Sequence, residues 1–159
     1  MVPDTHDVHA LISIEAPRLR RLFRDWDDQR RGREFPSRAD FTPFSLKYML
    51  GNLSLLDVAY NPLRFRYRIH ASNLARRMKK EMTNKFIDDI PVSDHAMRVR
   101  KHFSEVIRCR IPVVYKRGDS DSDFPDDHLP RDCEVLVLPL SSDGIAINML
   151  MSAMVWDTE

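Results

Sequence analysis

The chain has 159 residues, a length that predicts one domain with a single hydrophobic core. Hydrophobic residues make up 43% of the chain and charged residues 31%, proportions that are typical of a globular protein and exclude general disorder. The 25 Lys and Arg nearly balance the 24 Asp and Glu, so the formal net charge is +1 and a general electrostatic attraction to nucleic acid is not expected.

The first predicted element is an amphipathic helix that ends near Gly32. Pro17 suits the start of a helix and Gly32 its stop. Four apolar residues recur at helical spacing on one face, namely Leu19, Leu22, Phe23 and Trp26. The opposite face carries interleaved arginines and aspartates, which favours a solvated face over a surface for nucleic acid or an acidic partner. We interpret residues 1–32 as a helical extension that precedes the domain proper, residues 33–159.

A β-hairpin is predicted after an irregular segment, residues 33–52, in which a short helix is expected near residues 44–49. Residues 53–60 form the first strand of the hairpin, residues 61–63 its turn and residues 64–71 its second strand. The second strand alternates strictly, and its apolar face carries Phe65, Tyr67 and Ile69.

The middle of the chain is predicted to be helical. Ser72 is a good N-cap for a short helix whose apolar residues are Leu74, Met78 and Met82. Ser93 is the N-cap candidate of a longer helix. That helix ends near Arg110, because the residue before Pro112 disfavours the α conformation. Its apolar face is formed by Val99, Phe103, Val106 and Ile107.

Three strands complete the predicted order, at residues 113–117, 133–140 and 145–155. The last two are apolar on both faces, so we expect them to lie centrally in the sheet. Residues 141–144 are predicted to form a tight hairpin loop between them, and the aspartate-rich residues 118–132 an exposed loop. Two strands, a helical crossover and three strands predict an α+β domain with a five-stranded antiparallel sheet.

This order of elements and several short motifs resemble the PAS superfamily. The motifs are PSRADFTP at residues 36–43, LSLLDV at 53–58, PLRFRYRI at 62–69, DDIP at 88–91 and LPLSSDG at 138–144. They are most similar to a bacterial family of single-domain PAS-like proteins of uncharacterised function. The resemblance implies a PAS-like fold and a sensory or ligand-binding role, and it offers no catalytic residues to carry over. Two glycines expected from that family are replaced here, by Ala71-Ser72 and Asn84-Lys85, so these loops are expected to differ in shape.

Cofactor and metal sites have little support in the residues. The Gly-x-Asn-Cys-Arg-Phe stretch that marks flavin-binding PAS domains is absent. His95 and His102 lie at the rim of the apolar stripe of the long helix, which favours contact with water over ligation of haem. The run from Asp119 to Asp123 lacks the glycine and the final glutamate of a calcium-binding loop, which favours a solvated loop over weak divalent binding. We predict neither a cofactor nor a metal.

The chain is not expected to be an enzyme. It contains neither the GxSxG motif of serine hydrolases nor the HExxH motif of zinc proteases, and it lacks both common nucleotide-binding glycine motifs. Asp88 and Asp89 are the remaining candidates for an acid–base pair. Adjacent aspartates before Ile-Pro more often cap the next element, and we favour that interpretation.

A pocket for a small apolar ligand is predicted between the sheet and the helices. Its lining residues are Phe65, Tyr67, Ile69, Phe103, Met149 and Met151. Methionines suit an adaptable cavity but also fill ordinary cores, so a fully packed interior remains the alternative. The predicted function is a sensory or ligand-binding module that acts through a protein partner or through its own oligomeric state. The alternative is a structural protein-interaction module without a ligand.

A homodimer built through the N-terminal helix is the predicted assembly. The apolar stripe of that helix must be buried, and its members are Leu19, Leu22, Phe23 and Trp26. One helix of this length covers only part of a five-stranded sheet, which leaves apolar area for a second subunit. The alternative is a monomer whose helix folds back over its own sheet.

The sequence also predicts a cellular compartment. Cys109 and Cys133 are too few for a disulfide framework, and the first residues lack the basic residues and apolar core of a signal peptide. No apolar run is long enough to cross a membrane. We therefore expect a reduced, cytoplasmic protein with no membrane partner.

Overall fold

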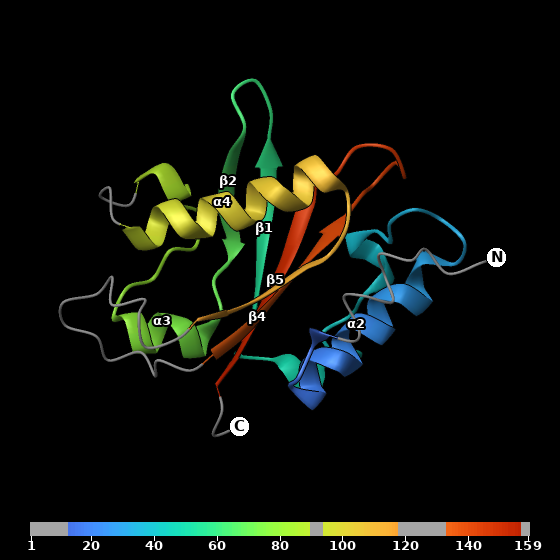
Figure 1. Cartoon of the computed structure of the whole chain (residues 1–159), viewed down its shortest axis with the longest axis horizontal. Coiled ribbons are helices and arrows are strands. Elements are labelled where there is room, and N and C mark those ends of the chain that lie inside the picture. Colours follow the sequence, from blue (N-terminus) through green and yellow to red (C-terminus); the bar gives the residue numbers. More distant parts are fainter. Residues whose placement is uncertain (1–12, 90–93, 118–132, 157–159) are drawn as a thin grey trace.

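The computed structural model describes residues 13–89, 94–117 and 133–156, whose elements follow the predicted order (Figure 1). The helices are α2 (Pro17–Arg30), α3 (Ser72–Met78) and α4 (Asp94–Cys109), and the 3₁₀ turns are η1 (Arg38–Asp40), η2 (Lys47–Met49) and η3 (Ile87–Asp89). The strands are β1 (Leu53–Ala59), β2 (Arg64–Ile69), β3 (Val113–Arg117), β4 (Cys133–Leu140) and β5 (Met149–Trp156).

All five strands form one antiparallel sheet in the order β2-β1-β5-β4-β3. The chain crosses from β2 at one edge to β3 at the other through α3, η3 and α4. These findings confirm the predicted α+β fold with a PAS-like five-stranded sheet and a helical crossover. Every residue of β4 is buried, as its apolar sequence predicts for an interior strand that is covered on both faces.

Helices cover both faces of the sheet. On one face, which α4 crosses in Figure 1, the ring of Phe103 packs edge-on against the ring of Phe65, with 5.5 Å between the centroids. On the other face, the carboxylate of Glu134 accepts hydrogen bonds from the N–H groups of Glu15 and Ala16, just before α2. Because cross-strand partners share a face and successive residues alternate, the registers place Phe65 and Glu134 on opposite faces.

The apolar stripe of α2 is buried by its own chain. Its four residues each expose 2% or less of their surface, and they are Leu19, Leu22, Phe23 and Trp26. The indole N–H of Trp26 also donates a hydrogen bond to the carbonyl of Pro139 in β4, at 2.9 Å. The structure therefore contradicts the assignment of these side chains to a dimer interface, because they leave no apolar area for a partner. The homodimer itself, and the boundary after residue 32, stay predictions.

A β-bulge changes the face on which Ile69 lies. Tyr67 pairs with Leu56, whereas Ile69 pairs with the adjacent Leu55, so Arg68 is an extra residue in β2. A bulge places two residues of one strand opposite one residue of its partner and breaks the alternation. The strict alternation predicted for this strand is therefore wrong at its end. Ile69 lies on the α2 face, where 46% of its surface is exposed, while Phe65 and Tyr67 lie under α4.

The last strand begins later than predicted, at Met149 instead of residue 145. The carboxylate of Asp143 accepts hydrogen bonds from the N–H groups of Ile145 and Ala146, and the amide oxygen of Asn148 accepts one from Ser142. Side chains thus satisfy backbone groups that a strand ladder would need, a competition that is typical of Asp and Asn in turns. The loop is accordingly wider than the predicted tight turn.

The helical middle also differs in detail from the prediction. Ala71 occupies the N-cap position of α3 and no side chain caps the helix, so the assignment of that role to Ser72 is wrong. Since α3 ends at Met78, Met82 lies beyond it instead of on its third turn. Ser93 and the side chains of Met78 and His95 lie outside the described part of the structure.

The packing under α4 yields a first prediction. Phe103 is almost fully buried and packs on Phe65, so Phe103→Ala should lower the free energy of unfolding by about 3–5 kcal/mol. Urea denaturation measures the loss. The matched control is Met97→Ala on the same helix, where the side chain is 61% exposed and the change should stay within about 0.5 kcal/mol. A loss below about 1.5 kcal/mol for Phe103→Ala would contradict tight packing at this position.

Candidate functional site: a groove on the α2 face

A groove of about 200 Å³ opens on the α2 face of the sheet. Its floor is apolar and comes from three strands, with Leu53 and Leu55 from β1, Ile69 from β2 and Met151 from β5. The bulge places Ile69 beside this floor, because it aligns Ile69 with Leu55 and Leu55 with Met151. The floor is therefore the part of the α2 face that lies toward the β2 edge of the sheet.

The wall of the groove is the segment between α2 and β1. It contributes Phe41, Pro43, Leu46 and Leu50, and it carries η1 and η2. Phe41 and Leu46 are buried, whereas Leu50 is 58% exposed at the rim. Near the end of the segment, Gly51 has a φ of +90°, and a Cβ atom there would lie 2.9 Å from the side-chain nitrogen of Asn73, so another residue would be strained at this position. A buried base and an exposed rim make this a site that a molecule can enter from solvent.

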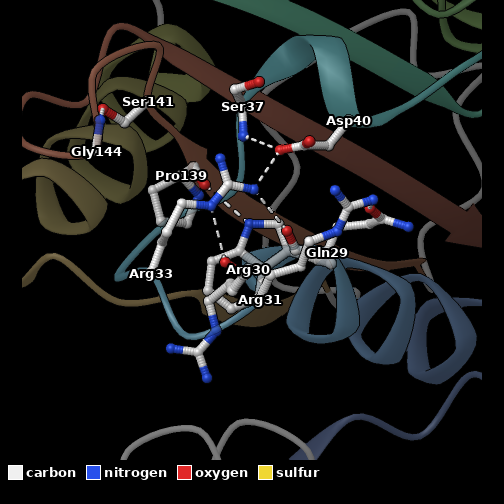
Figure 2. A network of polar contacts seen from close by, with 10 residues as sticks. Gln29, Arg30, Arg31, Arg33, Ser37, Asp40, Pro139, Ser141 and Gly144 are labelled. Carbon is white, nitrogen blue, oxygen red and sulfur yellow. Dashed lines mark hydrogen bonds and ion pairs between the residues drawn. The ribbon is translucent and has the colours of Figure 1, made fainter.

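A polar network fixes the wall to the end of α2 (Figure 2). The guanidinium of Arg33 donates hydrogen bonds to the carbonyls of Gln29 and Arg30, at 2.8 and 2.9 Å, and to the carboxylate of Asp40, at 2.7 Å. Asp40 also accepts the N–H of Ser37, at 2.7 Å. This N–H, together with Arg33, holds the pKa of the Asp40 carboxyl below its usual range, against the effect of burial. The carboxylate thus stays charged and anchors η1.

A second set of contacts joins η2 to α2. The hydroxyl of Tyr48 donates a hydrogen bond to Asp25, and the guanidinium of Arg21 lies 3.9 Å from the centre of the Tyr48 ring. Burial and the neighbouring carboxylate raise the pKa of Tyr48 well above its usual range, so the hydroxyl keeps its proton and remains a donor. A movement of the wall is therefore transmitted to α2 through two sets of contacts, those of Arg33 and those of Tyr48.

His70, Ala71 and Ser72 line the groove where β2 ends. The side chain of His70 is fully buried, and its Nδ1 accepts the N–H of Met82 at 3.2 Å. Burial lowers the pKa of His70, although the Glu81 carboxylate, 3.6 Å away, acts in the opposite direction. The imidazole is therefore neutral near pH 7, with its proton on Nε2, because Nδ1 is an acceptor.

Under α4, the cavity that the described residues form is much smaller. There the described residues enclose a cavity of only about 20 Å³, whose lining includes Tyr67, Leu74, Phe103 and Tyr115. That volume holds roughly one water molecule. As far as the described residues reach, the side chains of the domain fill the location where the sequence predicted a ligand.

The sheet divides the six residues predicted to line one pocket. Phe65, Tyr67 and Phe103 come together under α4, as expected. Ile69 and Met151 line the groove on the opposite face, and Met149 is buried on that face outside the groove. The prediction of a single pocket is wrong for two reasons. It assumed unbroken alternation in β2, which the bulge interrupts, and it did not consider on which face of the sheet Met149 and Met151 of β5 lie.

Sequence reasoning missed the wall of the groove, including Arg38, which is the one fixed charge among the described residues that line the groove. Residues 33–52 have no regular period, so no pattern linked them to a site. The usable signal was composition, because apolar residues in an irregular segment must find a partner surface and the uncovered half of the sheet offers one.

The sequence predicts no metal site. Among the described residues, no group of three or more His, Cys, Asp or Glu could hold a metal ion. The ring of His102 stacks on Tyr115 with 3.6 Å between centroids, and the acidic run from Asp119 to Asp123 lies outside the described residues.

Within the ranges described, none of the helices combines the length and apolarity needed to cross a membrane.

Comparison with known families agrees with this architecture. A family model with the description "PAS domain" matches residues 14–154. The chain belongs to the PAS domain family. The matched region of this PAS domain includes α2, which the structure packs into the same core as the sheet. Searches of curated proteins and of solved structures gave no match. The PAS resemblance is thus confirmed, whereas the narrower resemblance to a bacterial family stays a prediction.

The environment of His70 predicts how the stability of this PAS domain depends on pH. Because the folded state lowers the pKa of His70, the unfolded chain binds more protons just below its ordinary pKa of 6.5. The free energy of unfolding should therefore fall as the pH is lowered from about 7.5 to about 5. In His70→Asn, an amide oxygen can replace Nδ1 as acceptor, and this decrease should be smaller. Denaturation at several pH values compares the two proteins, and superimposable pH profiles would contradict the prediction.

Proposed function

We propose that this PAS domain is a non-catalytic sensory module whose binding site is the groove on the α2 face. Membership of the PAS family supports a sensory or interaction role in general. The observation that carries the finer proposal is the difference in volume between the groove, about 200 Å³, and the cavity under α4, about 20 Å³. An apolar cavity of about 150 Å³ is enough to bind benzene, so the groove has room for a small apolar ligand.

The signal in this proposal is a population shift. A ligand that fits between wall and floor favours the conformation of the wall that accommodates it. Two sets of contacts join the wall to α2: Arg33 binds both Asp40 and the last carbonyls of α2, and Tyr48 binds Asp25. These contacts give the helix a way to report occupancy. The output then passes to a protein partner or to the oligomeric state of the domain, for which a homodimer is our expectation.

A structural protein-interaction module is the second candidate, and the exposed rim favours it. Leu50 at the rim is 58% exposed, and Phe44, which follows the lining residue Pro43 in the chain, is 85% exposed. Large exposed apolar side chains are typical of interaction sites. In this second candidate function, an apolar side chain of a partner protein fills the groove. A cytoplasmic location, which the low number of cysteines in the sequence favours, is part of this proposal.

The test is binding of an uncharged apolar probe, 1-octanol, followed by NMR of the full chain. Saturable shifts should appear at signals of groove residues such as Leu55 and Met151. Ile69→Lys should weaken binding at least about tenfold, because it places an ammonium group where apolar contact is needed. Met97→Lys on α4, at a more exposed position, is the matched control and should bind as the wild type does.

Two outcomes would contradict the ligand-sensing proposal. One is the absence of any saturable shift at the groove. The other is binding that Ile69→Lys leaves unchanged, which would place the probe elsewhere on the molecule.

A further inference from the structure

We propose that the ligand of the groove is a free medium-chain monocarboxylate whose carboxylate pairs with Arg38 at the rim while its hydrocarbon part lies on the apolar floor. This inference rests on the proposed function and names the class of molecule that the site selects. It follows from the charges that line the groove, from the position of Arg38 and from the dimensions of the cavity.

The charge of the groove is one-sided. Of the described residues that line it, Arg38 alone carries a fixed charge, and none is Asp or Glu. The one lining histidine, His70, is neutral, as argued above. Thr42 and Ser72 add polarity without charge, and the hydroxyl of Thr42 already accepts the N–H of Ser45. An anion is therefore favoured at this site and a cation is not.

The guanidinium of Arg38 has donors to spare. Toward the described residues it donates one hydrogen bond, from an NH group to the carbonyl of Phe41 at 3.1 Å, and a guanidinium has five N–H groups. Within the described residues no carboxylate pairs with it, since the adjacent Asp40 is engaged by Arg33 and Ser37. Arginine binds a carboxylate through two parallel hydrogen bonds, a geometry that a single neutral hydroxyl cannot match.

The position of Arg38 is fixed by the wall itself. It begins η1, whose Asp40 is anchored to the end of α2, and its bond to Phe41 ties it to a buried residue of the groove. The guanidinium of Arg38 is thus held at the edge of the cavity. A carboxylate that pairs with it there remains in contact with solvent. A ligand that uses both features must carry its anionic group at one end and hydrocarbon at the other.

The volume sets the size of the hydrocarbon part. If about 150 Å³ accommodates the six carbons of benzene, about 200 Å³ accommodates a body of roughly eight carbons. The charged head lies outside this volume, at the rim. Octanoate has these dimensions, and 1-octanol is its neutral counterpart of equal chain length.

Calorimetric titration of the full chain with octanoate and with 1-octanol tests the inference. The wild type should bind octanoate about three- to tenfold more tightly than 1-octanol, and added salt should reduce the difference because the pair is exposed to solvent. Arg38→Gln should remove this preference, so that the variant binds octanoate no more tightly than it binds 1-octanol. Arg38→Lys should keep part of it, and Arg24→Gln, an exposed arginine of α2 outside the groove, should keep all of it.

The outcomes separate this inference from the proposed function. Equal affinity for the two probes, abolished for both by Ile69→Lys, would retain the groove as the site and overturn the carboxylate. A preference for octanoate that survives Arg38→Gln would also overturn it. Loss of octanoate binding as the protein concentration rises would identify a second copy of the chain as the occupant. Absence of groove binding by either probe would refute the proposed function as well.

Discussion

The structure depends on one constraint, which is that the central strands are apolar on both faces. β4 is buried along its whole length and β5 almost so, and such strands are stable only if something covers each side of the sheet. Five strands about 4.8 Å apart span about 19 Å, whereas a helix with its side chains is about 10 Å wide. A single helix per face therefore cannot cover the sheet, and further cover has to come from other segments.

The groove is a consequence of how that shortage is met on the α2 face. α2 packs on β4 and β5, and the irregular segment with η1 and η2 covers the floor toward β1 and β2. Short 3₁₀ turns do not present a continuous apolar stripe as an α-helix does, so their contact with the strands is incomplete. The bulge in β2 adds to the gap, because it places Ile69 on a face where the cover is thin. Under α4 the rings of Phe65 and Phe103 pack together, and the cavity that the described residues form there is only about 20 Å³.

The parts of the fold that could be predicted are those with a clear period in the sequence. The stripe of α2 from Leu19 to Trp26 and the apolar runs of β4 and β5 mark their elements in the sequence. α2 and β4 formed where they were expected, whereas β5 begins at Met149 instead of residue 145. The bulge at Arg68 could not be predicted, because it depends on the register with β1, which is a property of two strands together. The groove combines that register with a wall that has no period at all. Asp143 shows a third limit, in which side-chain hydrogen bonds delay the start of a strand whose sequence is apolar.

The contacts that join the wall to α2 are weaker than those that hold α2 on the sheet, and this difference fits a reporting role. Arg33 and Asp40 are partly exposed, and an ion pair of that kind contributes about 0–1 kcal/mol. The buried stripe of α2 contributes more, since each fully buried large apolar side chain adds about 1.5–3 kcal/mol. An occupant of the groove can therefore rearrange the wall at low cost without detaching α2 from the sheet. The helix would then report through its exposed, arginine-rich face and its C-terminal end, where Arg33 binds the last carbonyl groups, while its apolar face stays in place.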